Sequence, residues 1–246
     1  MHKSVAYFLL LLIFVGCTSN PKELSLEHKI IGDQSPVIIF ENGMASTFET
    51  WKQIPDSLSN KATILLYNRA GLGLSDSTKT KRTIPNMVED LNTLLQQKDL
   101  QGPYILVAHS MGSYLSRYFA LKYPEKVSGI LLIDPSPDTM YDEYTEKETQ
   151  DFLAFGNENF KNSSKGAKDE WENYLDNRKF VQQPISDDIP MTILSATQWD
   201  FYKYHELILN KNSKSKHLKI EGSHDLHHER PDSIINEIHH LIELSQ

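Results

Sequence analysis

Short, continuous apolar runs alternate along the chain with longer segments in which apolar residues recur every three or four positions. The runs occupy residues 36–40, 62–67, 104–108, 127–133 and 191–196. Uninterrupted aliphatic and β-branched runs of this length are typical of parallel strands that are buried on both faces. The segments with helical spacing occupy residues 85–95, 111–123 and 231–244. This alternation predicts an α/β domain with a doubly wound, mostly parallel sheet over residues 36–246.

The alternation stops between the fourth and fifth predicted strands. Residues 137–190 contain no strand-like run and are rich in Asp, Glu, Lys and Asn. The aromatic residues of this segment are Tyr141, Tyr144, Phe152, Phe155, Phe160, Trp171 and Tyr174. A connection of this length is either functional or disordered, and its aromatic residues favour an ordered one. We therefore expect a small helical cap over the carboxyl edge of the sheet. The alternative is a solvated excursion without a role in binding.

The amino-terminal segment has the pattern of an export signal. A basic start precedes the apolar run 5–15, which at eleven residues is too short to cross a bilayer as a helix. The run ends in FVGC, which resembles a bacterial lipobox, whose cysteine is acylated and becomes the new amino terminus. We therefore expect a signal peptide over residues 1–16, a lipid anchor on Cys17 in the cell envelope, and a tether with an edge strand over 17–35. An ordinary secretory signal and an uncleaved anchor are the alternatives.

Composition argues against several kinds of partner. The formal net charge is −8 and no cluster of Lys and Arg is interleaved with aromatic residues, so we expect no nucleic-acid partner. A single cysteine can form no internal disulfide and rules out the usual cysteine-based zinc sites. Four of the ten histidines are adjacent pairs, at 227–228 and 239–240, and the second pair lies in a predicted helix. This placement favours structural roles, and we expect no metal.

The third apolar run leads into the sequence HSMG, residues 109–112. Ser110 is thereby placed on the turn between a predicted strand and a predicted helix, with the small residues Ala108 and Gly112 two positions to either side. Small residues are needed there because the backbone of such a nucleophile turn is strained and neighbouring segments press close. We therefore expect Ser110 to be a nucleophile and the amide of Met111, at the helix N-terminus, to donate to an oxyanion. The alternative role for Ser110 is a helix N-cap.

Three further motifs flank this turn in the chain. The sequence NGM (42–44) follows the first apolar run, NRAGLGLS (68–75) follows the second, and EGSH ends at His224 shortly before the last predicted helix. Together with the serine turn, these motifs resemble the α/β-hydrolase fold family from residue 36 to the end of the chain. The resemblance implies that Met44 donates the second oxyanion amide and that His224 is the general base.

Two positions depart from the family pattern, since Asn42 stands where His is usual and Asn68 where Asp is usual. The exchange at position 42 leaves the backbone role of the turn intact, but it changes the contacts that the side chain can make. Within the second motif, Gly71 and Gly73 are expected only to shape turns. The resemblance also implies that the side chain of His109, beside the nucleophile, points away from the site.

The acid of the predicted triad has two candidates. In the commonest family arrangement the acid follows the strand 191–196, where Asp200 lies one residue beyond the usual position. In a second arrangement, seen in haloalkane dehalogenases and some lipases, the acid follows the preceding strand. Asp134 lies there, 24 residues after Ser110, which matches that arrangement without a gap. We favour Asp134 over Asp200, although either carboxylate at a strand end can orient His224.

These expectations together predict a serine hydrolase that cleaves an ester or related acyl bond of a small molecule through an acyl-enzyme. A serine nucleophile argues against dehalogenase and epoxide-hydrolase activity, since those relatives use aspartate there. The predicted chemistry needs no cofactor. Some members of the fold keep the triad and act chiefly as ligand receptors or signalling partners. A ligand-binding protein with little turnover is therefore the alternative function.

Overall fold

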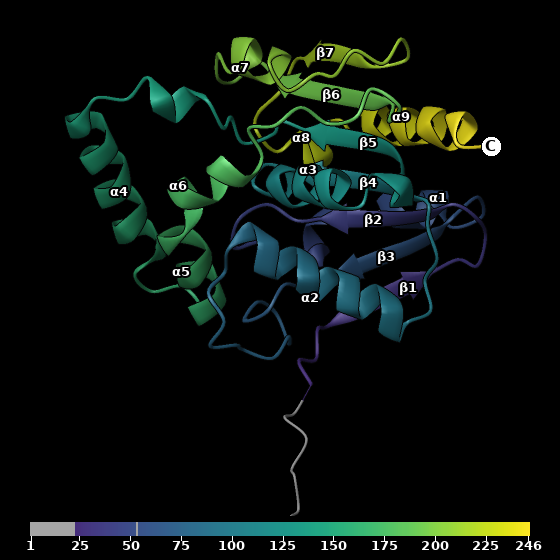
Figure 1. Cartoon of the computed structure of the whole chain (residues 1–246), viewed down its shortest axis with the longest axis horizontal. Coiled ribbons are helices and arrows are strands. Elements are labelled where there is room, and N and C mark those ends of the chain that lie inside the picture. Colours follow the sequence, from purple (N-terminus) through teal and green to yellow (C-terminus); the bar gives the residue numbers. More distant parts are fainter. Residues whose placement is uncertain (1–22, 53) are drawn as a thin grey trace, which may run out of the picture.

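The computed structural model describes residues 23–52 and 54–246. The predicted signal peptide, residues 1–16, and the predicted lipid anchor, Cys17, lie outside these described residues. Within them, no helix has both the length and the apolar character that crossing a bilayer requires. The described chain enters the molecule beside strand β1, His28–Ile31, which forms one edge of a sheet (Figure 1).

In the described part of the chain, seven strands form one sheet in the order β1-β3-β2-β4-β5-β6-β7 (Figure 1). The remaining strands are β2 (Val37–Glu41), β3 (Thr63–Tyr67), β4 (Tyr104–His109), β5 (Val127–Ile133), β6 (Met191–Ala196) and β7 (Lys216–Ile220). Neighbouring strands are parallel except for β1, which pairs antiparallel with β3. The five apolar runs of the sequence form β2 to β6, which confirms the predicted doubly wound, mostly parallel sheet.

Helices cover both faces of this sheet. The helices are α1 (Ile54–Leu58), α2 (Ile84–Gln97), α3 (Gly112–Lys122), α4 (Glu146–Phe160), α5 (Lys165–Glu172), α6 (Tyr174–Asn177), α7 (Tyr202–Glu206), α8 (Leu226–Glu229) and α9 (Pro231–Leu244). Helices α2 and α3 pack on one face, and α1, α8 and α9 on the other (Figure 1). In β2, Ile39 belongs to the first core and its neighbours Ile38 and Phe40 to the second. Successive strand residues point to opposite faces, so a strand covered on both sides is apolar throughout.

The sequences of the two longest sheet-packing helices explain this layering. A proline lies in the first turn of both α2 and α9, where the missing N–H leaves no hydrogen bond unmade. The buried residues of α2 are Ile84, Met87, Val88, Leu91, Leu94 and Leu95. Their spacing of three and four residues keeps them on one side of the helix, which therefore has an apolar face for the sheet and a polar face for solvent.

Helices α4, α5 and α6 form a cap that lies between β5 and β6 in the sequence and projects past the carboxyl ends of the parallel strands (Figure 1). Helix α4 begins at a capping box formed by Thr145 and Glu148. The cap has its own aromatic core, in which the ring centroid of Trp171 lies 5.1 Å from that of Phe152 and 5.9 Å from that of Tyr174. The cap is therefore an ordered element rather than an extended surface excursion.

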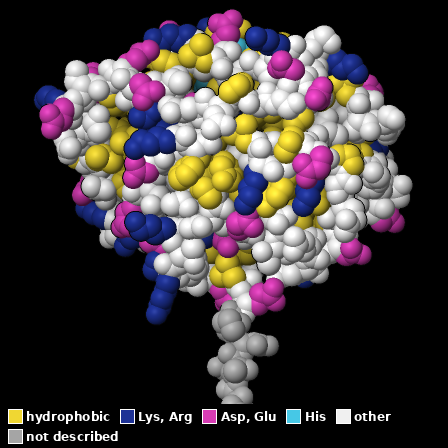
Figure 2. Space-filling model, viewed as in Figure 1, with side chains coloured by type: hydrophobic (Ala, Val, Ile, Leu, Met, Phe, Trp, Pro, Cys, Tyr) yellow, Lys and Arg dark blue, Asp and Glu magenta, His cyan; other side chains and the backbone are white. Residues whose placement is uncertain are grey.

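The cap meets the body of the molecule along helix α3. Figure 2 shows hydrophobic side chains gathered on this face between the cap and α3, with charged residues of both signs around them. At the junction, the ring centroid of Phe180 lies 6.1 Å from that of Tyr118 in α3. Arg117 of α3 pairs at 2.8 Å with the buried carboxylate of Asp138, at the start of the cap segment. Apolar and ionic contacts together fix the cap on this side.

A second attachment of the cap is a backbone contact between two glycines. Gly71, in the loop after β3, has a φ of +80°, which explains glycine at a turn. A Cβ on Gly71 would also lie 2.8 Å from Gly166 of α5, and a Cβ on Gly166 would lie 2.6–2.7 Å from the backbone of Ala70 and Gly71. The sequence suggested that Gly71 only shapes a turn. The structure shows a second role, because the absence of a side chain at Gly71 also lets the cap helix approach closely.

We expect Gly166→Ala to lower the free energy of unfolding by about 1–3 kcal/mol, the range for forcing extra atoms into a packed site. The clashing atoms belong to the backbone, so no side-chain rotation can make room. Chemical denaturation monitored by circular dichroism measures the change, with Glu172→Ala at an exposed position of the same helix as control. Alanine for glycine at an unhindered helix position stabilises by about 0.5–1 kcal/mol, so a gain in stability would contradict the close contact.

Candidate active site

Ser110 lies on a sharp turn between β4 and α3 and has a φ of +51°. This left-handed conformation is strained for a residue with a Cβ. Two backbone hydrogen bonds hold it, since the Ser110 amide donates to the Ile133 carbonyl at 3.1 Å and the Ser136 amide donates to the Ser110 carbonyl at 3.1 Å. A Cβ on Gly112 would lie 2.5 Å from the Glu41 carbonyl oxygen. The predicted need for a small residue at that position is thus explained by the end of β2.

Asp134 occupies the end of β5 and also has a left-handed backbone, with a φ of +40°. Its carboxylate is only 2% exposed and has two partners. Oδ2 lies 2.6 Å from Nδ1 of His224, and Oδ1 accepts a hydrogen bond of 2.9 Å from the Ala196 amide. The Asp134 amide donates to the Leu194 carbonyl at 2.7 Å. The carboxylate is therefore fixed by the neighbouring strand β6 while it holds the imidazole.

Asp200, the alternative acid, lies on the exposed loop that follows β6. The contacts of this loop with His224 come from two other residues. Gln198 Oε1 accepts a hydrogen bond of 2.7 Å from the His224 amide, and the ring centroid of Trp199 lies 5.0 Å from that of His224. The structure thus brings together Asp134 and His224, whereas the loop of Asp200 supports the histidine through an amide oxygen and an indole.

His109 lies against the candidate general base. Its Nε2 donates to the His224 carbonyl oxygen at 2.9 Å, and the two ring centroids are 4.6 Å apart. Burial, followed by the neighbouring histidines, lowers the pKa of His109 well below its ordinary value. The expectation that this side chain points away from the site is wrong. The neutral imidazole of His109 lies against the ring of His224 and holds the backbone of that residue.

These contacts gather the predicted residues at the carboxyl edge of the sheet. The backbone of Ser110 is hydrogen-bonded to Ile133 and Ser136, which flank Asp134 in the chain. The Asp134 carboxylate in turn contacts His224. The Ser110 hydroxyl itself forms no hydrogen bond with another described residue, a loose arrangement that is common in unliganded sites. The group therefore contains candidates for the nucleophile, the base and the acid that acyl transfer requires.

The turn after β2 provides the second set of backbone groups. Asn42, which replaces the usual histidine, donates from Nδ2 to the Tyr67 carbonyl at 2.9 Å and accepts at Oδ1 from Trp51 Nε1 at 2.7 Å. A Cβ on Gly43 would lie 3.5 Å from the Cβ of Ser110, so this turn presses directly on the serine. The candidate oxyanion amides of Met44 and Met111 thus lie on two segments that are in contact.

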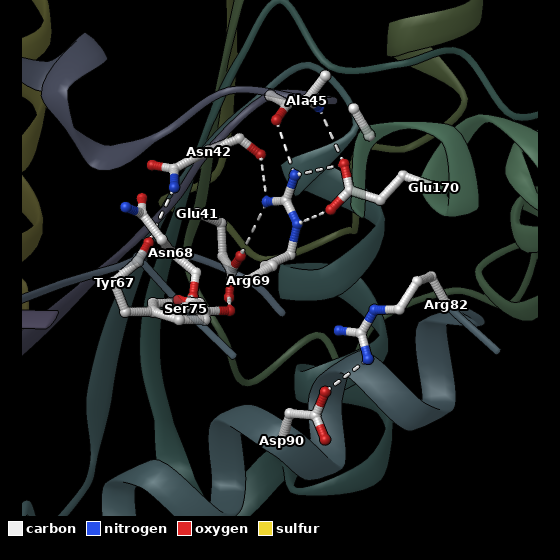
Figure 3. Close-up of polar contacts among 12 residues, drawn as sticks. Glu41, Asn42, Ala45, Tyr67, Asn68, Arg69, Ser75, Arg82, Asp90 and Glu170 are labelled. Atoms are coloured by element: carbon white, nitrogen blue, oxygen red, sulfur yellow. Dashed lines mark hydrogen bonds and ion pairs between the residues drawn. The ribbon is translucent and has the colours of Figure 1, made fainter. Parts of the chain in front are cut away.

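A buried ionic group beneath this turn carries residues that the sequence did not single out (Figure 3). The guanidinium of Arg69 lies 2.5 Å from Oε1 and 3.0 Å from Oε2 of Glu170, which belongs to cap helix α5. Glu41 accepts a hydrogen bond of 2.5 Å from the Tyr67 hydroxyl, and its other oxygen lies 3.8 Å from Arg69. Burial raises the pKa of Glu41 to about 7, against the lowering effect of Arg69. Arg69 lies in the loop motif 68–75, which gave it no role of its own, and no sequence signal distinguished Glu170 from a solvated glutamate.

One group of described residues has metal-ligating side chains close together, namely His109, Asp225 and His227, whose ligand atoms lie within 4.8 Å of one another. Asp225 is exposed, and the histidines already make contacts. His109 donates to His224, and His227 Nε2 lies 2.7 Å from the hydroxyl of Thr50. Burial lowers the pKa of His227 to about 3. The two rings also pack the loop of His224 against the body.

Comparison with known proteins identifies the family to which this fold belongs. A family model for the alpha/beta hydrolase fold matches residues 36–164, and the chain therefore belongs to the α/β-hydrolase fold family. It is 26% identical over 219 residues to the uncharacterized protein YqjL of Bacillus subtilis, covering 81% of each chain. It is 30% identical over 118 residues to the 2-(acetamidomethylene)succinate hydrolase of Mesorhizobium japonicum, which covers 48% of this chain and 40% of that enzyme.

Several solved structures share the architecture. A marine microorganism esterase superposes with a TM-score of 0.68 at 18% identity, covering 89% of this chain and all of that one. An esterase from Thermogutta terrifontis gives 0.69 at 19% identity, with coverage of 93% and 97%. The enol-lactonase of Burkholderia xenovorans LB400 gives 0.69 at 14% identity, with coverage of 89% and 97%. At such low identities these likenesses establish the fold.

We expect Asp134→Asn to reduce kcat for ester hydrolysis by about 10⁴-fold, because asparagine at this place stabilises the wrong tautomer of the histidine it contacts. Asp200→Asn should reduce kcat far less, since the carboxylate is exposed. Steady-state kinetics of both single variants and of the double variant, with folding checked by circular dichroism, measure the difference. The opposite order, with Asp200→Asn nearly inactive and Asp134→Asn largely active, would assign the acid role to Asp200.

Proposed function

We propose that this protein is a serine hydrolase that cleaves a carboxylic ester or a related acyl bond through an acyl-enzyme on Ser110. The observation that carries the proposal is the 2.6 Å contact of the buried Asp134 carboxylate with His224 Nδ1, beside a serine on a strained strand-to-helix turn. A carboxylate at Nδ1 leaves Nε2 of the imidazole as the proton acceptor. A histidine that only packed the interior would not need this orientation.

The proposed reaction has two halves. His224 Nε2 takes the proton of the Ser110 hydroxyl while Oγ attacks the substrate carbonyl carbon, and the amides of Met44 and Met111 stabilise the resulting oxyanion. The tetrahedral intermediate collapses as the C–O bond to the alcohol breaks, and the alcohol leaves with the proton held by His224. In the second half, His224 takes a proton from water while the water oxygen attacks the acyl carbon of the acyl-enzyme. The bond to Ser110 Oγ then breaks, the acid is released, and His224 returns the proton to Ser110. This sequence requires no cofactor from the protein.

The substrate class is a small molecule with an activated acyl group. The fold neighbours described above are named as esterases and an enol-lactonase, and one relative as an acetamidomethylene succinate hydrolase. Ester, lactone and amide bonds are all open to the same attack on a carbonyl.

Ser110→Ala should lower hydrolysis of a short-chain p-nitrophenyl ester by at least about 10⁴-fold, because only binding and the oxyanion amides remain. Ser113→Ala is a matched control, since the Ser113 hydroxyl is buried in the first turn of α3, three residues after Ser110, without a hydrogen-bond partner among the described residues. A fluorophosphonate probe should label wild type and Ser113→Ala on Ser110 alone. Labelling at another residue, or turnover that survives in Ser110→Ala, would refute the assignment.

We further propose that the protein is an exported lipoprotein anchored through Cys17. The support is the sequence pattern alone, an apolar run of signal-peptide length that ends at the cysteine of a lipobox-like FVGC. A lipid anchor at this point would leave the described domain at the membrane surface, joined to it by the tether that precedes β1. Small acyl substrates in the cell envelope would then reach the site from the aqueous side.

We expect the protein made in a bacterial host to partition into the detergent phase, and Cys17→Ser to retain residues 1–16. Cleavage by the lipoprotein signal peptidase requires the modified cysteine, so the variant should accumulate as a precursor of larger mass. Phase partition and intact-protein mass spectrometry measure both effects. Wild-type protein found only in the aqueous phase, with an unmodified amino terminus at another residue, would contradict the anchor.

A further inference from the structure

We propose that Glu170 is a positioning residue for the oxyanion hole, through which the cap sets the orientation of the Met44 amide. This inference rests on the proposed hydrolase function and concerns the same site. Glu170 lies on helix α5 of the cap and is fully buried. It does not touch the triad, and its effect would pass through the turn after β2.

The peptide groups on both sides of Met44 are held by this network (Figure 3). Arg69 Nη2 donates to the Gly43 carbonyl oxygen at 2.8 Å, and Glu170 Oε2 accepts from the Ala45 amide at 2.9 Å. The Gly43 carbonyl and the Met44 amide belong to one trans peptide unit, in which C=O and N–H point in opposite directions. Holding that carbonyl toward Arg69 therefore directs the Met44 N–H away from Arg69.

The turn needs such support because its backbone is strained. Ala45 has a φ of +59°, a left-handed conformation that disfavours residues with a Cβ. The hydrogen bond from the Ala45 amide to Glu170 stabilises this conformation directly. Arg69 adds a third bond, from Nη1 to the Asn42 carbonyl oxygen at 2.8 Å. The Gly43 carbonyl also accepts a longer hydrogen bond, 3.3 Å, from the Ser46 amide. Without the contacts of Arg69 and Glu170, this bond alone would hold the peptide before Met44, and its N–H would be less firmly directed as an oxyanion donor.

Glu170 also keeps Arg69 in place. The Arg69 side chain is 1% exposed, and a buried guanidinium requires a well-placed counter-charge. The two oxygens of Glu170 face Nε and Nη2 in a paired arrangement that fixes the plane of the guanidinium. Arg69 can then aim its remaining donors at the two carbonyls of the turn. Loss of Glu170 would therefore remove the Ala45 contact and loosen the Gly43 contact together.

The position of Glu170 couples the turn to the cap. Gly166 and Glu170 are four residues apart on α5 and so lie on the same side of the helix. Gly166 rests on the backbone of Gly71, while Glu170 reaches Arg69 in the same loop motif. A cap that is displaced from this loop withdraws Glu170 from the turn. The oxyanion hole is thus complete only when the cap is seated.

The central test is Glu170→Gln, which keeps the side-chain volume but replaces one acceptor oxygen by an NH₂ group that must face either the Ala45 amide or Arg69. We expect kcat to fall by up to about 10²–10³-fold, the effect of losing one oxyanion donor, while KM changes by less than about threefold. The matched control is Glu172→Gln on the same helix, where the same charge is removed from an exposed side chain, and it should keep the wild-type kcat.

A second variant separates positioning from charge compensation. Arg69→Met combined with Glu170→Met removes the ion pair and leaves Glu41 as the remaining buried carboxylate, which can take up a proton because burial raises its pKa to about 7. The double variant should therefore fold with a melting temperature closer to that of wild type than either single change. Because it still lacks the bonds to Gly43 and Ala45, we expect its kcat to stay low. Recovery of the wild-type kcat in this double variant would overturn the proposal, since the pair would then serve stability alone.

Hydrogen exchange gives a readout that does not depend on turnover. In Glu170→Gln, the amides of the turn, residues 42–46, should exchange faster than in wild type and in Glu172→Gln. If wild type neither hydrolyses esters nor reacts with a fluorophosphonate, the proposed function fails, but the exchange difference still reports whether Glu170 holds the turn. Wild-type exchange in this segment together with wild-type kcat in Glu170→Gln would refute the positioning role.

Discussion

The site depends on one backbone constraint, which is that the chain must leave parallel strands abruptly at their carboxyl ends. Ser110 follows β4, Asp134 follows β5 and Ala45 lies in the turn after β2, and all three have positive φ values. Each of these conformations is unfavourable for a residue with a Cβ. Each is held by hydrogen bonds to a neighbouring segment: Ser110 to Ile133 and Ser136, Asp134 to Leu194, and Ala45 to Glu170. The geometry of the candidate site is therefore a property of adjacent strand ends acting together.

Two of these three turns are supported by the sheet itself, whereas the third depends on a charge in the interior. Strand β6 holds Asp134 through two main-chain groups, the Leu194 carbonyl and the Ala196 amide, which lie in place because β5 and β6 pair. The turn at Ala45 is held chiefly by side chains, with Arg69 and Glu170 bonded to Gly43 and Ala45. A buried ion pair adds little net stability, because desolvation offsets the attraction, but removing one partner is strongly destabilising. Such a pair serves better to fix an orientation than to stabilise the fold.

The sequence predicted what depends on local pattern, and it was least informative where distant segments meet. Apolar runs buried on both faces predicted β2 to β6, and the strand-to-helix context singled out Ser110. The choice between Asp134 and Asp200 could not be settled by counting, because the loop after β6 turns Gln198 and Trp199 toward His224. The role of the acid remains a prediction.

Glu170 was beyond the reach of sequence reasoning for a physical reason. It lies 101 residues from its partner Arg69 on a helix whose other charged residues face solvent, and composition alone cannot tell a buried carboxylate from an exposed one. Its surroundings have a further consequence for the fold. Here the cap helix contacts the turn that carries Met44, the proposed oxyanion donor, through the hydrogen bond of the Ala45 amide to Glu170. With Met44 as the proposed oxyanion donor, changes in cap packing would alter the rate of the chemical step, because the same helix holds the turn that carries Met44.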